Sequence, residues 1–300
     1  MLRRGSSDRR RATAGPTGPT GEIGTTTAPY RPLVVAHRGS SHEMAEHTLA
    51  AYQRAITDGA DALECDVRLT RDGHLVCVHD RRVERTSNGR GVVSEFDLAE
   101  LSRLDFGSWH PRLPDSADEL IKPGHPEPER LAPERQPVLT FAELLELVVD
   151  APRPLKLLVE TKHPTRYAGL VERALVTELR RYGLHDPPDP AAAPVTVMSF
   201  SVLAVRRVAE LAPKLPTVLL LNGAPVRLRT GGLPGTTRIA GPGIDLVRDN
   251  PQFVERMHEA GNQVYVWTVN EPSDLDLVTS LRVDGIITDR PADVVRVLHR

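Results

Sequence analysis

The sequence is poor in several features that mark particular classes of protein. Only two cysteines occur among 300 residues, Cys65 and Cys77, which excludes a disulfide framework and a cysteine-based metal site. No apolar run approaches the roughly 20 residues needed to cross a membrane, so no stable membrane insertion is expected. The net charge is only −2, which gives no electrostatic reason to expect binding to nucleic acid. The composition, 40% hydrophobic and 26% charged, is that of an ordinary soluble globular enzyme.

The first thirty residues contain almost no large apolar side chains. They are basic at first and then rich in Gly, Pro and Thr. Two adjacent arginines, Arg3 and Arg4, resemble part of an export signal, but the apolar stretch that should follow is missing. We therefore expect a disordered tail over residues 1–30 and a cytoplasmic protein.

After Pro32, apolar runs typical of strands alternate with amphipathic stretches typical of helices. The expected strands are Leu33–His37, Ala62–Arg68, Leu155–Thr161, Val195–Ser199, Thr217–Leu221, Gly243–Val247, Gln263–Val269 and Asp284–Thr288. The expected helices are Leu49–Asp58, Phe141–Val149, Tyr167–Tyr182, Val202–Leu211, Gln252–Ala260, Ser273–Leu281 and Ala292–His299. This α/β order predicts one domain over residues 31–300 with the (β/α)8 TIM barrel fold. A doubly wound open sheet is the alternative, because alternation alone does not show closure.

One interval interrupts the alternation. Between Arg81 and Pro137 the only helical candidate is Leu98–Leu104, and seven prolines follow from Pro111 onward. Long segments of this kind inside a compact domain are usually functional excursions or disordered loops. We interpret residues 81–137 as a small insertion after the second strand, over one face of the barrel.

The stretch "ALECDVRLTRDGHLVCVHD" predicts a β-hairpin, because Asp72-Gly73 is a strong turn signal between two strand-like runs. A two-residue turn would pair Asp66 with His79. Glu64, Asp66 and His79 would then share one face, and Cys65 would point away from Cys77. Two carboxylates beside a histidine suggest a divalent-ion site next to a proton-transfer group, although an ordinary surface hairpin would explain the Glu-x-Asp pair alone.

Other strand ends carry similar chemistry. In a closed parallel barrel the carboxyl ends of all strands meet at one rim, where catalysis takes place. That rim would collect three carboxylates, two cations and two histidines, namely Glu64, Asp66, Glu160, Arg38, Lys162, His37 and His79. Three carboxylates need a cation, the basic side chains can hold an anion, and the histidines can move protons. Phosphate-ester chemistry on a hard metal ion fits this set.

The same residues fall within blocks that resemble the glycerophosphodiester phosphodiesterase family. The blocks, in the family's order, are His37-Arg38-Gly39, Ala45-Glu46-His47-Thr48, Glu64-Cys65-Asp66, Thr70-Arg71-Asp72-Gly73, His79-Asp80, Arg85-Thr86 and Gly89-Arg90-Gly91-Val92. Later blocks are "RQPVLTFAELL", "VETK", "MSF", "VYVWTVN" and "VDGIITDRP". The resemblance covers the chain from Leu33 to its end. One departure is His47, which replaces an asparagine and whose charge would vary near pH 6–7.

The resemblance implies a TIM barrel that hydrolyses glycerophosphodiesters, its small-molecule substrates, to sn-glycerol 3-phosphate and an alcohol. It implies that Mg²⁺ or Ca²⁺ binds to Glu64, Asp66 and Glu160. It further implies acid/base catalysis by His37 and His79 through a cyclic phosphate, and substrate contacts from Arg38, Lys162 and Trp267. The role of Glu46 is left open. A lysophospholipase D acting on a lipid diester is an alternative on the same fold, and a non-catalytic binding protein is a third.

Overall fold

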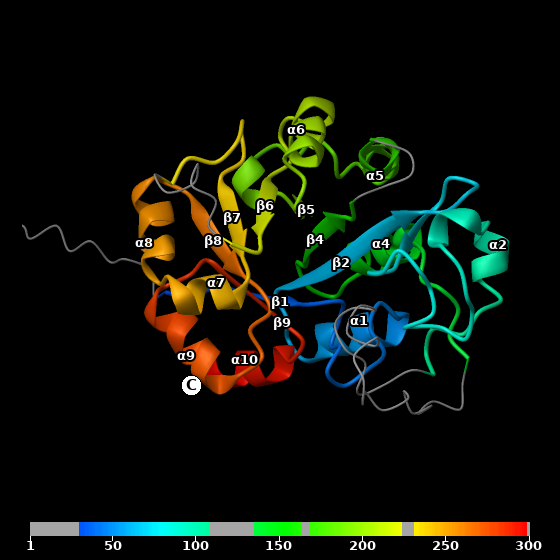
Figure 1. The fold of residues 1–300 in the computed structure, drawn as a ribbon, viewed down its shortest axis with the longest axis horizontal. Helices are drawn as coiled ribbons and strands as arrows, with labels where there is room; N and C mark the ends of the chain where they lie inside the picture. Colours follow the sequence, from blue (N-terminus) through cyan, green and yellow to red (C-terminus); the bar gives the residue numbers. More distant parts are fainter. Residues whose placement is uncertain (1–29, 109–134, 164–168, 224–230, 299–300) are drawn as a thin grey trace, which may run out of the picture. The chain divides into compact units, whose positions relative to one another are not determined.

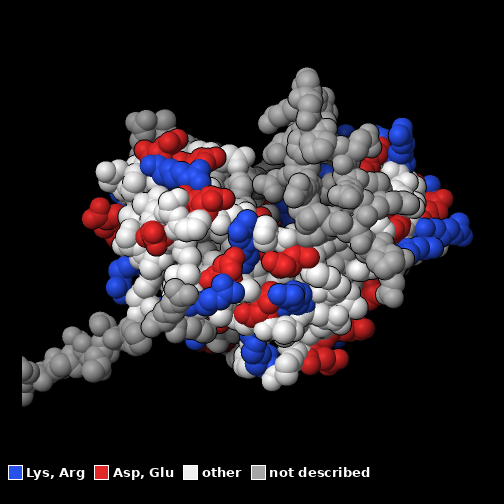
Figure 2. All heavy atoms as spheres, turned by 90° about the horizontal axis from the view of Figure 1, so that it is seen from below, with Lys and Arg blue, Asp and Glu red and all other residues white. Residues whose placement is uncertain are grey.

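The computed structural model of the protein describes residues 30–108, 135–163, 169–223 and 231–298. Nearly all of the expected tail, the proline-rich half of the expected insertion, and the first two residues of the helix expected from Tyr167 lie outside these residues. Among the described residues, no helix is long and apolar enough to cross a membrane. On the face seen in Figure 2, acidic and basic side chains are intermixed.

Eight parallel strands form a closed barrel, as the alternating sequence predicts (Figure 1). The first strand pairs with both the second and the last barrel strand, and this double pairing closes the sheet. The barrel strands are β1 (Leu33–Ala36), β2 (Ala62–Leu69), β4 (Lys156–Thr161), β5 (Val195–Ser199), β6 (Thr217–Leu221), β7 (Ile239–Pro242), β8 (Gln263–Val266) and β9 (Gly285–Thr288). A further short strand, β3 (Leu75–Cys77), pairs antiparallel with β2 outside the barrel. The (β/α)8 barrel is therefore confirmed.

Helices lie between most successive barrel strands and cover the outside of the barrel, except for one short helix in the excursion after β3 (Figure 1). They are α1 (Leu49–Thr57), α2 (Leu98–Leu101), α4 (Phe141–Val149), α5 (Leu170–Arg181), α6 (Val202–Leu211), α7 (Ile244–Asp249), α8 (Gln252–Glu259), α9 (Pro272–Ser280) and α10 (Pro291–Leu298). Short 3₁₀ helices occupy Val93–Glu95 and Pro190–Ala192. Hydroxyl side chains cap the N-termini of α1, α4 and α6, because Thr48, Thr140 and Ser201 accept hydrogen bonds from amides of the first helical turn.

Alternating side chains of the strands divide the core into an inner and an outer layer. The inner cluster fills the barrel with residues such as Val35, Leu158 and Ile287. The outer clusters pack the other strand face against the helices. Because both faces are buried, the strands are almost uniformly apolar until they reach the carboxyl-end rim. Charged side chains at the strand ends therefore stand out from the otherwise apolar strands.

The strand expected at Gly243–Val247 is wrong. The sixth barrel strand, β7, lies earlier, at Ile239–Pro242, and the predicted segment is mostly helix α7. Gly-Pro inside Ile239–Pro242 reads as a turn from sequence. In the fold, a Cβ on Gly241 would lie 2.7 Å from a Leu220 methyl carbon, so the close strand contact requires glycine. The contact with the neighbouring strand β6 decides the strand here, and the sequence pattern does not reveal it.

The hairpin after β2 forms, but its register differs by one residue from the predicted one. Val67 pairs with Cys77, and the amide of Val78 bonds the carbonyl of Asp66, so Asp66 does not pair with His79. The connection has three residues between Thr70 and His74, with Gly73 at φ +89°. Cys65 and Cys77 consequently face the same apolar cluster as free thiols, opposite to expectation.

Candidate active site

The carboxyl ends of the strands surround a cavity of about 480 Å³. Seven of the eight site residues expected from the sequence line it, namely His37, Arg38, Glu64, His79, Glu160, Lys162 and Trp267. The eighth, Asp66, is 1% exposed and lies behind the lining, in contact with Lys162. The opposite wall is apolar and includes Met198, Phe200 and Leu220. The fold thus brings together groups that are up to 230 positions apart in the sequence.

Three carboxylates form a compact buried cluster at the base of the site. Glu64 and Asp66 come from β2, and Glu160 comes from β4, where it is the direct register partner of Asp66. One oxygen from each carboxylate lies within 4.8 Å of the others. Oxygen donors at this spacing are the ligands that hard divalent cations prefer. The donor set therefore fits a Mg²⁺ or Ca²⁺ ion.

The ionisation of the cluster reflects its burial. Burial and then the charge of Asp66 raise the pKa of Glu64 to about 8. Burial, partly offset by Lys162, raises the pKa of Glu160 to about 7. Asp66 behaves in the opposite way: burial works against its ionisation, but Lys162 and other positive neighbours hold its pKa well below the usual range. A cation between the three groups would stabilise their charged forms.

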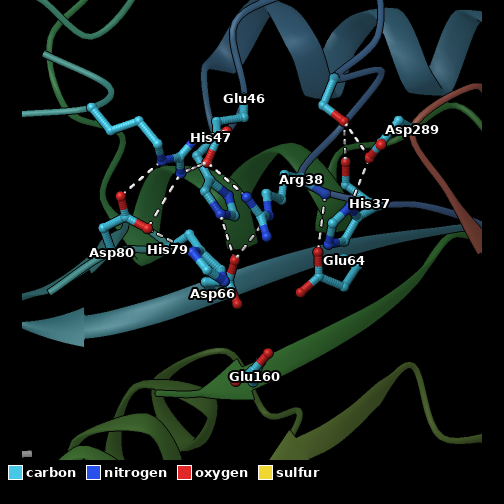
Figure 3. A network of polar contacts seen from close by, with 12 residues as sticks. His37, Arg38, Glu46, His47, Glu64, Asp66, His79, Asp80, Glu160 and Asp289 are labelled. Atoms are coloured by element: carbon cyan, nitrogen blue, oxygen red, sulfur yellow. Dashed lines mark hydrogen bonds and ion pairs between the residues drawn. The ribbon is translucent and has the colours of Figure 1, made fainter. Parts of the chain in front are cut away.

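Both histidines are held by carboxylates in the same manner (Figure 3). Nδ1 of His37 lies 2.7 Å from Asp289, and Nδ1 of His79 lies 2.8 Å from Asp80. Carboxylates accept the Nδ1 protons, so the Nε2 atom of each neutral ring carries no proton. These contacts fix the tautomer and the orientation of both rings.

The two rings differ in proton affinity. Burial and then Arg38 lower the pKa of His79 to about 3. Burial and Arg38 also act to lower the pKa of His37, but Asp289 and Glu64 outweigh them and the net shift is upward. The charge of His37 and three hydrogen bonds, from His37, Ser41 and Asn270, lower the pKa of Asp289 to about 2 despite its burial. Near neutral pH, His79 is a neutral base and His37 more readily carries a proton.

Asp289 is a site residue that the sequence reading missed. It follows β9 directly and also accepts hydrogen bonds from Ser41 Oγ at 2.8 Å and from Asn270 Nδ2 at 2.6 Å. The signal was available, because Asp289 ends the last strand of the barrel and therefore reaches the same rim as His37. Asp80, which holds His79, lies in the His79-Asp80 block, but the sequence alone assigns it no role.

The two cationic side chains lie on either side of the carboxylates. Lys162 Nζ is 2.9 Å from Glu160 and 3.3 Å from Asp66. Arg38 is 5% exposed and has a left-handed backbone, with φ 57°. Its amide donates to Glu64 at 3.0 Å, and its guanidinium bonds Glu46 at 3.0 Å. Both cations border the cavity, where an anionic substrate would meet them.

His47 occupies the position at which the sequence departs from the family pattern. Its Nε2 lies 2.9 Å from Asp66 Oδ2, and its Nδ1 lies 2.8 Å from the Tyr52 hydroxyl. Burial is the main cause that lowers the pKa of His47, so the neutral ring donates to Asp66 through Nε2. The side chain that was expected to titrate near pH 6–7 is instead a buried, neutral hydrogen-bond donor.

Trp267 lies on the apolar side of the cavity, just after β8. Its indole N–H donates to the carbonyl of Gly241 at 2.8 Å. Phe200 meets it edge to face, with ring centroids 5.5 Å apart at 89°. The fixed indole therefore presents a rigid apolar wall opposite the charged groups.

Comparison with known proteins gives one family. Residues 37–293 match the model of the glycerophosphoryl diester phosphodiesterase family. A probable glycerophosphodiester phosphodiesterase 1 of Mycobacterium tuberculosis is 45% identical over 264 residues, which cover 87% of this chain and 90% of the relative. The glycerophosphodiester phosphodiesterase of Caldanaerobacter subterraneus is 33% identical over 270 residues, covering 89% and 98% of the two chains.

A solved structure agrees. A phosphodiesterase of Oleispira antarctica, in complex with the product sn-glycerol-3-phosphate, superimposes with a TM-score of 0.73 at 25% identity, covering 90% of this chain and 97% of its own. A protein of Galdieria sulphuraria shares the fold at 20% identity and a TM-score of 0.72. This chain therefore belongs to the glycerophosphoryl diester phosphodiesterase family, a family of phosphodiester hydrolases.

Proposed function

We propose that the protein hydrolyses glycerophosphodiesters to sn-glycerol 3-phosphate and an alcohol. The observation that carries this proposal is one cavity lined by two carboxylates, two cations and two carboxylate-bound histidines, with Asp66 directly behind. The Oleispira relative, whose structure contains sn-glycerol-3-phosphate, supports the same product here. The charged half of the cavity suits a phosphodiester, and the apolar half can receive carbon atoms on either side of it.

Glu64, Asp66 and Glu160 would hold a Mg²⁺ or Ca²⁺ ion. Such an ion supplies charge neutralisation at the phosphate oxygens when it is bound. Arg38 and Lys162 are proposed to bind those oxygens from either side of the carboxylate cluster. Trp267 is proposed to pack against the carbon atoms of the substrate and to exclude water from that side.

The two histidines are proposed to divide acid and base catalysis. Environments that push two pKa values apart are typical of such pairs. His79, the weaker base held neutral by burial and Arg38, accepts the proton of the glycerol 2-hydroxyl. The hydroxyl oxygen bonds to phosphorus, the bond to the alcohol oxygen breaks, and His37 gives its proton to that oxygen. Water then opens the cyclic phosphate, with the two rings in reversed roles.

One observation favours a second candidate, a lysophospholipase D acting on a lipid diester. Phe200 lines the cavity and is 40% exposed, and Leu203, one turn along at the start of α6, is 64% exposed. Apolar groups at the mouth of the cavity would suit an acyl chain. An assay of choline release separates the candidates, because lysophosphatidylcholine and glycerophosphocholine differ only in that chain.

The test is a coupled assay for released sn-glycerol 3-phosphate. It uses glycerophosphocholine, glycerophosphoethanolamine and glycerophosphoglycerol, each with and without added metal. We expect turnover of at least one diester that depends on the metal. Choline release from lysophosphatidylcholine at a higher kcat/KM would favour the second candidate, and no release from any diester would reject both.

A further inference from the structure

Arg85 is a fully buried charged side chain with no role in the chemistry described above. Its side chain is 0% exposed, and it lies between two carboxylates. Its Nε donates to Asp80 at 2.7 Å, and its two terminal nitrogens donate to Glu46 at 2.5 and 2.6 Å. Removing a guanidinium from water is costly, and this arrangement offsets the cost with charge-assisted hydrogen bonds on both sides.

Each carboxylate also contacts a residue of the proposed active site (Figure 3). Asp80 uses Oδ1 to hold Nδ1 of His79 at 2.8 Å while Oδ2 accepts from Arg85. Glu46 uses Oε1 to hold Arg38 at 3.0 Å while both of its oxygens accept from Arg85. The result is one chain of alternating charge that runs from His79 through Asp80, Arg85 and Glu46 to Arg38.

The position of Arg85 in the sequence makes this chain informative. Arg85 belongs to the segment that follows the β2–β3 hairpin, outside the barrel strands. That segment is itself anchored, because Val83 is buried and Ser87 Oγ donates to its carbonyl at 2.8 Å. Through Asp80 and Glu46, Arg85 therefore links the position of this excursion to His79 and Arg38.

We infer that Arg85 is a positioning residue for two functions at once, orienting His79 through Asp80 and Arg38 through Glu46. The inference rests on the proposed function, because it assigns proton transfer to His79 and phosphate binding to Arg38. It also gives Glu46 a role: its carboxylate joins two guanidiniums that would otherwise repel each other across the site. A purely structural ion cluster would stabilise the fold without dividing its effects between catalysis and binding.

Two near-isosteric variants separate the effect on His79 from the effect on Arg38. Asp80→Asn weakens the acceptor for the Nδ1 proton of His79, so kcat should fall by at least about tenfold while KM changes little. Glu46→Gln removes a charge beside Arg38, so KM and the dissociation constant of sn-glycerol 3-phosphate should rise by about tenfold, with a smaller change in kcat. Arg85→Lys keeps one charge but cannot bridge both carboxylates, so it should show both defects.

The matched control is Arg82→Lys, the same exchange three residues away, at a side chain that is 55% exposed and forms an ion pair with Glu84. It should leave both kinetic constants unchanged. If Arg85→Lys does not fold, the Asp80 and Glu46 variants still decide the question. Wild-type kcat and KM in both, with only a lowered Tm, would overturn the inference.

Two readouts do not depend on turnover, so failure of the inference is distinguishable from failure of the proposed function. Calorimetry with sn-glycerol 3-phosphate measures the dissociation constant that Glu46→Gln is expected to raise. Nitrogen chemical shifts of the His79 ring report its tautomer, which should be Nδ1-protonated in the wild type and the Glu46 variant and altered in Asp80→Asn. An inactive wild-type protein would reject the proposed function. An unchanged tautomer in Asp80→Asn together with unchanged binding in Glu46→Gln would reject the positioning role.

Discussion

His47 donates a hydrogen bond from Nε2 to Oδ2 of Asp66 at 2.9 Å, and both side chains are almost completely buried. On its other side the ring meets the Tyr52 hydroxyl, which lies 3.1 Å from the carbonyl of Glu64. A single imidazole thus contacts, directly and through Tyr52, the strand that carries two of the three clustered carboxylates. Partners of this kind orient metal ligands and commonly change metal affinity when removed.

The first prediction concerns this contact. His47→Ala should weaken Mg²⁺ or Ca²⁺ binding by about 10- to 100-fold, because Asp66 loses an orienting donor. His47→Asn should stay close to the wild type, since an amide also donates and asparagine tolerates the left-handed backbone, here at φ 58°. Metal dissociation constants from calorimetry provide the measurement.

Two controls separate the side chain from the backbone. His47→Gly accepts the positive φ without strain but has no donor, so it should resemble the alanine variant. His74→Ala changes an exposed histidine in the hairpin loop and should have no effect. Wild-type metal affinity in the glycine variant would mean that the ring does not orient Asp66.

The second prediction links the metal to protons. The pKa values of Glu64 and Glu160 are raised to about 8 and about 7, so both carboxyls hold protons that a metal ion must displace. Affinity should therefore rise between about pH 6 and pH 8.5, and binding should release protons. Calorimetry in buffers of different ionisation enthalpy counts them. Affinity that is independent of pH, with no proton release, would contradict this coupling.

The same shifts predict how stability depends on pH. Both pKa values are raised in the folded state, so the protonated carboxyls favour folding of the metal-free protein. This contribution to the free energy of unfolding is fully present below the ordinary glutamate range and is lost as pH rises through 7 and 8. Metal offsets the repulsion that appears on ionisation. The rise in Tm caused by saturating metal should accordingly be larger at high pH than at low pH, and smaller in Glu160→Gln at every pH.

The parts of this molecule that could be predicted from sequence are those fixed by local patterns. Helices such as Phe141–Val149 and Val202–Leu211 were predicted to the residue, because apolar periodicity and a hydroxyl cap coincide at each. The charged strand ends at Glu64 and Glu160 were also visible, because a charge that interrupts a buried strand is rare. The pattern alone indicated phosphate-ester chemistry on a metal ion, and the family resemblance added the substrate class and the roles of individual residues.

What could not be predicted depends on contacts between distant segments. The bond between His37 and Asp289 joins residues 252 positions apart. The strand order places both residues at the same rim, but no local signal pairs their side chains. The predicted hairpin register was wrong because Asp72-Gly73 is compatible with both a two-residue and a three-residue loop. Arg85 was noted as part of a family block, but its burial between Asp80 and Glu46 arises only when the excursion packs on the barrel.

The third prediction separates chemistry from packing at the two histidines. His37→Ala and His79→Ala should each lower kcat by roughly 10²- to 10⁴-fold, the usual contribution of a general acid or base. Both rings border the cavity and lie outside the apolar clusters, so Tm should change little. A variant that loses Tm and keeps kcat would show that its histidine is structural.

The fourth prediction concerns the first thirty residues. Their sequence contains almost no apolar side chain that could dock on the barrel, so we propose that deleting residues 1–30 leaves Tm and kcat nearly unchanged. Circular dichroism melting and the coupled assay compare the two chains. A substantial loss of either property in the shortened chain would mean that the segment packs on the barrel or completes the site.

The last prediction tests whether the substrate supplies its own nucleophile. If Arg38 and Lys162 hold the phosphate while His79 takes the proton of the 2-hydroxyl, attack on phosphorus is intramolecular. Good orientation of such a group can contribute several kcal/mol, up to about 7–11 in the best cases. A 2-deoxy analogue of glycerophosphocholine should therefore keep a similar KM, through the same phosphate contacts, but lose most of its kcat. Equal kcat for the two substrates would mean that water attacks phosphorus directly. The carboxylate cluster and the cations would keep their proposed roles in that case, but His79 would act on water and no cyclic phosphate would form.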